Sequence, residues 1–217
     1  MPAAAVRTQD MNDLAIEITA MNKWYGSFHV LRDINLSVKR GEKLVICGPS
    51  GSGKSTTLYA ALQRLDASTR NILTVEDPVE FVHTPKRAQI THREVGHDAS
   101  SFASAIRSAG REDADVILIG EMRDAETIGA ALTAAETGHL VLATLHANDA
   151  SQAIDRIIDV FPPAQQEQVR TQLSMALQAV LAQRLVPRVG GGRVAAYEIL
   201  MGTPAVTNLI REGKTAQ

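Results

Sequence analysis

The stretch Gly48-Pro49-Ser50-Gly51-Ser52-Gly53-Lys54-Ser55-Thr56 decides the fold of this chain. It fits the phosphate-loop pattern G-x-x-x-x-G-K-[ST] at every fixed position. The apolar run Leu44–Cys47 precedes it and predicts a buried strand, whereas Thr57–Leu62 follows it and predicts the start of a helix. A strand, a glycine-rich loop and a helix in this order are the context in which the pattern forms a phosphate site. A glycine turn that carries a lysine by coincidence is the alternative.

Glycines in such a loop let successive backbone N–H groups turn inward around an anion, because they adopt positive φ angles without strain. The helix that follows adds its free N–H groups and the positive end of its dipole. We expect Lys54 to reach the β- and γ-phosphates of a nucleotide, and Ser55 to ligate Mg²⁺ through its hydroxyl. The residues predicted to bind the nucleotide here are Gly48, Ser50, Gly51, Ser52, Gly53, Lys54, Ser55 and Thr56.

The composition predicts a globular chain and argues against two classes of partner. The 217 residues are 45% hydrophobic and 21% charged, and the formal net charge of −2 gives no electrostatic reason to expect nucleic-acid binding. No apolar run approaches the roughly 20 residues of a membrane-spanning helix, so we expect no direct membrane insertion. The single cysteine, Cys47, excludes an internal disulfide and is expected to be a buried structural thiol. These features are typical of a cytoplasmic protein.

The segment before the loop predicts a loose tail followed by a β-hairpin. Residues 1–13 are rich in alanine and polar side chains, without an apolar signal core. Alternating apolar and polar residues over 14–38 then predict two antiparallel strands, with a turn at Tyr25-Gly26-Ser27. We expect one face of this hairpin, assigned to residues 14–43, to be buried and the other to face water.

Residues 15–56 resemble the opening of an ABC transporter ATPase, close to the polar amino-acid importers. The resemblance implies that Tyr25 takes the place of the aromatic residue that stacks on adenine in that family. A turn residue that covers the hairpin is the alternative interpretation of Tyr25. The sequence contains no segment like the LSGGQ motif, which caps the partner subunit's nucleotide in that family. We take this difference as an argument against a working transporter ATPase.

Three further apolar runs each end in an ionisable side chain. These runs are Ile72–Val75 before Glu76, Val116–Ile119 before Gly120 and Glu121, and Leu140–Leu145 before His146. Each is the length of a buried strand, and the carboxyl ends of strands in an open parallel sheet lie where such sheets bind ligands. The sequence therefore predicts that these side chains share a site with the phosphate loop. Solvated acids at strand ends, and a histidine that caps a backbone carbonyl, are the alternatives.

Helix patterns separate these strands and continue to the end of the chain. We predict helices over residues 98–109, 124–136, from 148 or 149 through 158, and from 162 through 180, then a strand over 194–200 and a helix from about 204. Strands that alternate with helices after a phosphate loop predict a parallel sheet of the RecA type. The predicted fold class is α/β: a RecA-like P-loop NTPase core over residues 44–217, its parallel sheet flanked by helices, with a small N-terminal antiparallel β-hairpin in front.

From the phosphate loop onward, the chain resembles the family of type IV pilus retraction and type II secretion ATPases. "ILTVEDPVEF" (72–81) is similar to the family's Asp box, "DVILIGEMRD" (115–124) to its Walker B segment, and "TGHLVLATLHANDA" (137–150) to its His box. "GGGRVAAYEIL" and "GTPAVTNLIRE" are similar to its C-terminal segments, although Thr207 stands where retraction ATPases carry an arginine. With its transporter-like front, the whole chain resembles a composite of two families joined at a loop that both share.

This second resemblance implies roles for four residues. Glu121 would hold Mg²⁺, through water, as the acid of the Walker B segment, and Glu76 would activate the attacking water as the acid of the Asp box. His146 would sense the γ-phosphate, and His139 would couple the site to a neighbouring subunit. Phosphoryl transfer needs a metal-bridged phosphate clamp, a group that orients water, and positive charge for the transition state.

The sequence therefore predicts an Mg-dependent ATPase, a motor of the pilus retraction or secretion type. The resemblance implies a homo-oligomer, most simply a hexamer, that works on an inner-membrane platform protein and is cytoplasmic or peripheral to the inner membrane. An ABC-type nucleotide-binding subunit, or an ATP-binding module with little turnover, is the alternative. We expect slow hydrolysis. In the resembled family, the arginines that stabilise the transition state come largely from an N-terminal domain, and here the transporter-like hairpin stands in its place.

Overall fold

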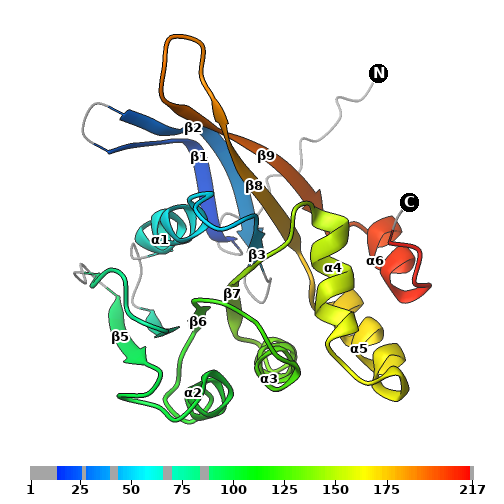
Figure 1. Cartoon of the computed structure of the whole chain (residues 1–217). Coiled ribbons are helices and arrows are strands. Elements are labelled where there is room, and N and C mark those ends of the chain that lie inside the picture. Colours follow the sequence, from blue (N-terminus) through cyan, green and yellow to red (C-terminus); the bar gives the residue numbers. More distant parts are fainter. Residues whose placement is uncertain (1–13, 26–27, 40–43, 66–69, 84–87, 216–217) are drawn as a thin grey trace, which may run out of the picture.

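A computed structural model describes residues 14–25, 28–39, 44–65, 70–83 and 88–215 of the chain. A seven-stranded sheet, in the order β5-β4-β6-β7-β3-β8-β9, forms the centre of the molecule (Figure 1). Its strands are β3 (Leu44–Cys47), β4 (Asn71–Glu76), β5 (Gln89–Glu94), β6 (Val116–Ile119), β7 (Leu140–Leu145), β8 (Ala179–Pro187) and β9 (Arg193–Met201). Neighbouring strands run parallel except β8 and β9, which pair antiparallel. The predicted α/β class with a parallel sheet is thus confirmed.

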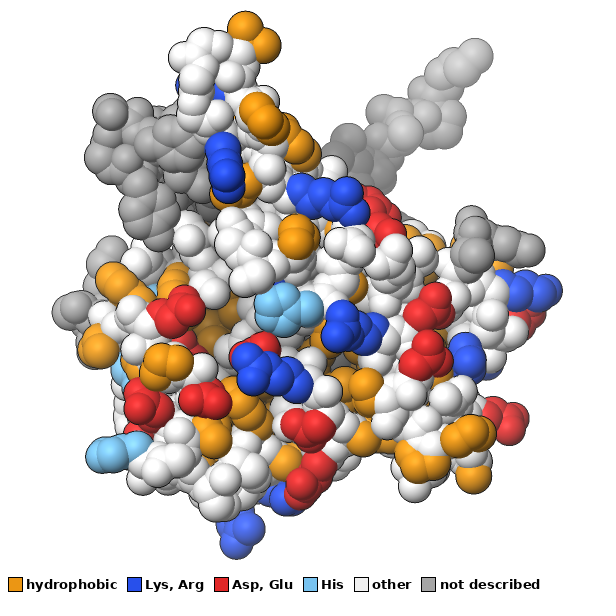
Figure 2. All heavy atoms as spheres, in the orientation of Figure 1, with side chains coloured by type: hydrophobic (Ala, Val, Ile, Leu, Met, Phe, Trp, Pro, Cys, Tyr) orange, Lys and Arg blue, Asp and Glu red, His pale blue; other side chains and the backbone are white. Residues whose placement is uncertain are grey.

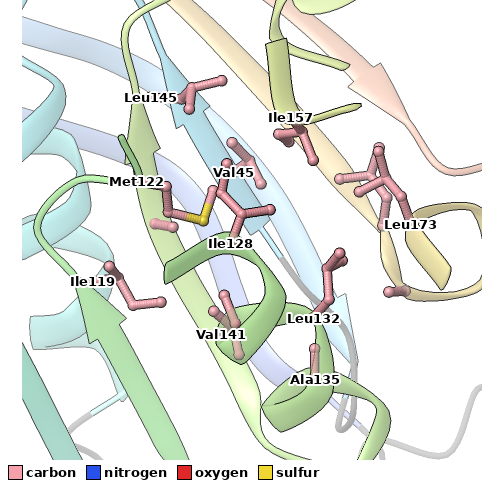
Figure 3. Close-up of a cluster of buried hydrophobic side chains, with 14 of the residues drawn as sticks. Val45, Ile119, Met122, Ile128, Leu132, Ala135, Val141, Leu145, Ile157 and Leu173 are labelled. Atoms are coloured by element: carbon pink, nitrogen blue, oxygen red, sulfur yellow. The ribbon is translucent and has the colours of Figure 1, made fainter. Parts of the chain in front are cut away.

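Helices cover both faces of this sheet. They are α1 (Lys54–Leu65), α2 (Phe102–Ala109), α3 (Ala125–Glu136), α4 (Ala150–Asp159), α5 (Pro163–Ala176) and α6 (Pro204–Arg211). Leu58 and Leu62 of α1 pack with Ile46 of β3 on one face, whereas α2 to α6 contribute to the larger cluster on the other face. Alternate residues of each strand point to opposite faces, so Val45 joins that larger cluster, drawn in Figure 3. Burial on both faces explains why the central strands are continuous apolar runs.

Short polar residues fix where the helices begin. Asp124 accepts a hydrogen bond from the backbone N–H of Thr127 at 2.8 Å and caps α3, and Asp149 caps α4 in the same way. Both caps lie where the sequence predicts them. The helix predicted from residue 98 begins later, because the cap of α2 is Ser101; Asp98 instead accepts a hydrogen bond from the backbone N–H of Glu94.

The predicted hairpin is present as β1 (Leu14–Tyr25) and β2 (Phe28–Lys39), which pair antiparallel in a separate two-stranded sheet. In Figure 1, β2 lies alongside β9, and β1 lies behind α1. The prediction of a loose tail concerns residues 1–13, which lie outside the described residues. Within the described part of the chain, no helix is both long enough and apolar enough to span a membrane.

Two strands differ from the sequence-based expectation. The helix predicted through residue 180 ends at Ala176, and Val180 lies in β8. Leu177 and Val180 continue the helical spacing of α5, but β8 is hydrogen-bonded to β3 on one side and β9 on the other, and these tertiary bonds outweigh the local pattern. β5 was not predicted because its sequence, QITHRE, is mostly polar, as suits the edge of a sheet that is only partly buried.

We expect the sheet centre to dominate stability. Ile117 of β6 is fully buried, so Ile117→Ala should lower the free energy of unfolding by about 2–5 kcal/mol through lost burial and a residual cavity. The matched change Ile199→Ala, at a side chain that is 45% exposed on β9, should cost well under half as much. Urea denaturation of both variants checks this, and equal losses would contradict the assignment of the core.

Candidate active site

A cavity of about 520 Å³ lies at the end of the sheet where the parallel strands terminate. We call it the loop cavity, because the phosphate loop from Ser50 to Thr56 forms one wall. Glu76, Glu121 and His146 also line it, although they are distant in sequence from Lys54, which lines it too. The structure thus brings the four predicted side chains together. On the face shown in Figure 2, acidic, basic and histidine side chains gather around a hollow near the centre.

The loop backbone has the conformation that its glycines permit. Gly51 and Gly53 adopt φ angles of +73° and +83°, which residues with a side chain rarely adopt. Gly48 does not line the cavity and lies beneath the loop, where a Cβ atom would come 2.3 Å from the backbone oxygen of Gln183. Gly48 is therefore required for the close approach of β3 and β8, and the remaining predicted loop residues face the cavity.

Lys54 is buried at the start of α1. Its Nζ donates hydrogen bonds to the backbone oxygens of Gly48 at 2.5 Å and Pro49 at 3.1 Å. Burial lowers the pKa of Lys54, while the nearby Cys47 and Glu121 act in the opposite direction. The ammonium group thus sits in a largely buried position with two carbonyl partners among the described residues, and it retains hydrogen-bonding capacity for an anion.

Gln183 supports the loop from β8, and sequence reasoning missed it. Its Nε2 donates to the backbone oxygen of Ser52 at 2.7 Å, and its Oε1 accepts from the hydroxyl of Thr57 at 2.7 Å. Gln183 is fully buried, so both bonds are shielded from water. A single amide therefore joins the loop, the first turn of α1 and β8. A glutamine inside the apolar run AVLAQRLV was the available signal.

Glu121 follows β6 and has one oxygen in an ion pair and one without a hydrogen bond. Oε1 pairs with the guanidinium of Arg123, which also lines the loop cavity. Oε2 is buried and has no hydrogen-bond partner among the described residues, although Nε2 of His146 lies 3.5 Å away. An anionic oxygen in this position can accept a bond from a bound water or hold a cation.

Glu76, at the end of β4, is 1% exposed. Its Oε2 accepts a hydrogen bond from the hydroxyl of Tyr59 at 2.5 Å. Its Oε1 has no hydrogen-bond partner within the described ranges, and Nδ1 of His92 lies 3.9 Å from it. A buried carboxylate oxygen that lacks a partner beside an open cavity is suited to receive a water proton.

His146 lies at the mouth of the cavity, just after β7. Partial burial lowers its pKa, and the charge of Lys54 acts in the same direction, so the imidazole is neutral at neutral pH. Arg156 of α4 donates to the backbone oxygen of His146 and holds the turn in place. A neutral ring beside Lys54 can donate one hydrogen bond to an anion without adding charge.

Of the other two predicted residues, His139 lies elsewhere and Tyr25 has a side chain that is not described. His139 lines a different pocket, between α2 and α3, where its Nδ1 is 2.9 Å from the backbone oxygen of Ala134. The side chain of Tyr25, at the end of β1, lies outside the described part of the structure. Cys47 is buried, and burial raises its pKa to about 12, as expected for a structural thiol.

The residues present fit a magnesium ion that takes few ligands from the protein and most of them from a bound phosphate compound and water. Ser55 and Glu121, the two predicted ligands, both line the loop cavity, and Oε2 of Glu121 lacks a hydrogen bond. Among the described residues, no group of three or more His, Cys, Asp or Glu side chains forms a ready cage for a metal. Mg²⁺ commonly uses one or two protein ligands and completes its octahedron with waters and phosphate oxygens.

We expect Gln183→Leu to destabilise the phosphate loop. The substitution removes the hydrogen bonds of the amide to the buried Ser52 carbonyl and to the buried Thr57 hydroxyl, which should cost about 1–3 kcal/mol for each bond. The matched change Gln168→Leu, at an exposed position of α5, should alter the free energy of unfolding by less than about 0.5 kcal/mol. Chemical denaturation checks both, and a neutral Gln183→Leu would contradict the support assigned to this amide.

His83, which follows the Asp-box segment, should make stability depend on pH. Burial and the neighbouring His92 lower the pKa of His83 to about 4, below the ordinary value of 6.5. The unfolded chain then binds more protons than the native chain between these values, so stability falls as pH drops from about 6.5 to 4. His83→Leu should flatten this dependence by at most about 3 kcal/mol, measured as unfolding free energy against pH. An unchanged slope would contradict it.

The sequence matches a known family model and several known proteins. The family model described as type II/IV secretion system protein matches residues 3–192. The type IV pilus retraction ATPase PilT of Pseudomonas aeruginosa is 58% identical over 181 residues, which cover 83% of this chain and 52% of that protein. A twitching motility protein of Neisseria gonorrhoeae is 55% identical over 176 residues, which cover 80% of this chain and 47% of that protein.

Solved structures of ATPases are also similar to this chain. The crystal structure of the pilus retraction motor PilT with bound ADP matches with a TM-score of 0.79 and 52% identity, over 82% of this chain and 52% of that one. The ATPase DotB of Legionella pneumophila matches with a TM-score of 0.73 and 35% identity, over 81% of this chain and 49% of that one. These matches confirm the predicted RecA-like fold. The chain spans about half the length of the relatives it matches.

The family match begins at residue 3, so it includes the hairpin segment whose sequence resembles transporter ATPases. That transporter likeness stays a prediction. The predicted likeness to pilus retraction and secretion ATPases is confirmed by the family match, the relatives and the solved structures together. The chain belongs to the type II/IV secretion system protein family.

Proposed function

We propose that this chain binds Mg-ATP in the loop cavity and hydrolyses it, as the ATPase core of a pilus retraction or secretion motor. The observation that carries the proposal is the meeting of Lys54, Glu76, Glu121 and His146 around one cavity of about 520 Å³. Phosphoryl transfer depends almost entirely on positioning and electrostatics, and this arrangement offers a cation, a base and a metal-side acid in one place.

The loop and the start of α1 supply the phosphate clamp. Positive φ angles at Gly51 and Gly53 turn the loop backbone around the cavity, and α1 begins at Lys54, so the positive end of its helix dipole lies at the cavity. The carbonyl oxygens that now accept from Lys54 hold the ammonium at the cavity wall, from which it can bond to phosphate oxygens instead. ADP in the related PilT structure supports a nucleotide as the ligand.

Other side chains that line the loop cavity would supply the remaining groups that hydrolysis needs. Glu76 presents an oxygen without a hydrogen bond, which can accept a proton from the attacking water. Ser55 and Glu121 would hold Mg²⁺, which supplies a positive charge that neutralises the phosphate oxygens. The neutral imidazole of His146 donates to the terminal phosphate, and its contact with Glu121 makes it sensitive to what that carboxylate binds.

The wider assembly belongs to the same proposal. We infer a homo-oligomer, a hexamer by the family resemblance, that acts on an inner-membrane platform protein from the cytoplasmic side. His139, on the pocket between α2 and α3, would serve contact with a neighbouring subunit rather than the chemistry. The division into residues 1–13, 14–43 and 44–217, and stacking of Tyr25 on adenine, are proposed on the sequence resemblance alone.

We expect two substitutions to separate binding from turnover. Lys54→Ala should weaken ATP binding at least tenfold, because charge-assisted hydrogen bonds contribute about 1.5–3 kcal/mol each. Glu76→Gln keeps the side-chain size, so it should leave ATP affinity within about threefold and lower the rate of phosphate release by about 10²–10⁴. Equilibrium binding of a fluorescent ATP analogue and a phosphate-release assay measure the two quantities.

Glu167→Gln provides the matched control, because Glu167 is an exposed acid on α5 that does not line the loop cavity. It should change neither ATP affinity nor phosphate release. A Glu76→Gln protein that hydrolyses ATP at the unsubstituted rate, or a Lys54→Ala protein with full affinity, would contradict the proposed site.

A further inference from the structure

Tyr59 connects the phosphate-loop helix to the carboxylate proposed as the base. The residue lies on α1, five positions after Lys54, and its side chain is partly buried and lines the loop cavity. Its hydroxyl donates to Oε2 of Glu76 across a gap of 2.5 Å. A hydrogen bond to an ionised acceptor is among the stronger kinds in proteins, so it holds the carboxylate in one orientation.

Two aromatic rings also lie against the ring of Tyr59. Its ring meets the ring of His83 edge-on at 4.9 Å, and that of Phe81 at 6.1 Å. His83 stacks on His92 with an interplanar angle of 10°. The rings of Tyr59, His83 and His92 thus contact one another in sequence, and the first and last of them, Tyr59 and His92, lie beside Glu76. These contacts join α1, the segment after β4, and β5.

The hydrogen bonds of His92 go to other groups, so the second oxygen of Glu76 has no hydrogen bond from this ring. The backbone N–H of His83 donates to Nε2 of His92 at 3.2 Å, so Nε2 is the acceptor and Nδ1 carries the ring proton. That proton is donated to the hydroxyl of Thr74 at 2.9 Å, whereas Oε1 of Glu76 lies 3.9 Å away. One oxygen of Glu76 is therefore tied by Tyr59, and the other keeps its capacity to accept a proton.

We propose that Tyr59 is a positioning residue for hydrolysis: its hydroxyl fixes the carboxylate of Glu76 so that Oε1 receives the proton of the attacking water. This inference rests on the proposed function, in which Glu76 is the base. It also gives a physical link between nucleotide binding and the base, because α1 carries both Lys54 at its start and Tyr59 one and a half turns later.

Tyr59→Phe tests the inference, because it removes the hydroxyl and keeps the ring contacts. We expect kcat for ATP hydrolysis to fall about tenfold with KM changed less than twofold, since the hydroxyl orients the base and does not contribute to nucleotide binding. In the Glu76→Gln background, Tyr59→Phe should cause no further loss, because the two residues act as one unit. Phe81→Leu trims the ring contacts and leaves the hydroxyl, so its kcat should stay within twofold.

The outcomes separate this inference from the proposed function. If the unsubstituted chain hydrolyses ATP and Glu76→Gln does not, but Tyr59→Phe turns over at the full rate, only the positioning role is overturned. An additive loss in the double variant, or a tenfold loss in Phe81→Leu, also overturns it, because either result assigns the effect to packing. If the unsubstituted chain shows no hydrolysis, or Glu76→Gln is fully active, the proposed function fails and this inference fails with it.

Discussion

Parallel pairing of the central strands is the constraint on which the rest of the structure depends. Because β4, β6, β7 and β3 run in the same direction, the residues that follow them meet at one edge of the sheet. Backbone bonds make this juxtaposition tight: the N–H of Gly120 donates to the carbonyl of Val75 at 2.8 Å, and a Cβ on Gly120 would lie 3.4 Å from Cα of Glu76. The two acids of the site are neighbours because their strands are neighbours.

The same edge concentrates polar groups that the protein leaves incompletely paired. Lys54 is buried and donates to two backbone carbonyls. Glu76 and Glu121, which line the loop cavity, each have a carboxylate oxygen that lacks a hydrogen bond in the described part of the chain. A buried group without a partner costs about 1–3 kcal/mol, so a fold selected for stability alone would avoid this arrangement. A triphosphate with its metal and an ordered water would complement these charges, which ties the local instability of the site to its proposed chemistry.

How far the sequence predicts this site depends on whether the signal is local. The phosphate loop, and the acids that end β4 and β6, were predictable because a short pattern and one general rule about parallel sheets suffice. β8 was not, since Leu177 and Val180 continue a helical spacing that only pairing with β3 and β9 overrides. The bonds of Gln183 to the loop, 131 positions away in sequence, likewise arise from strand order and not from any local pattern.

A crystal structure of the chain with Mg²⁺ and a non-hydrolysable ATP analogue tests the central claim most directly. The account predicts the triphosphate in the loop cavity, with Nζ of Lys54 moved from the carbonyls of Gly48 and Pro49 to phosphate oxygens, and with an ordered water on Oε1 of Glu76. An analogue bound elsewhere, or a cavity that holds the triphosphate while Lys54 keeps its present carbonyl partners and Glu76 Oε1 stays dry, would contradict it.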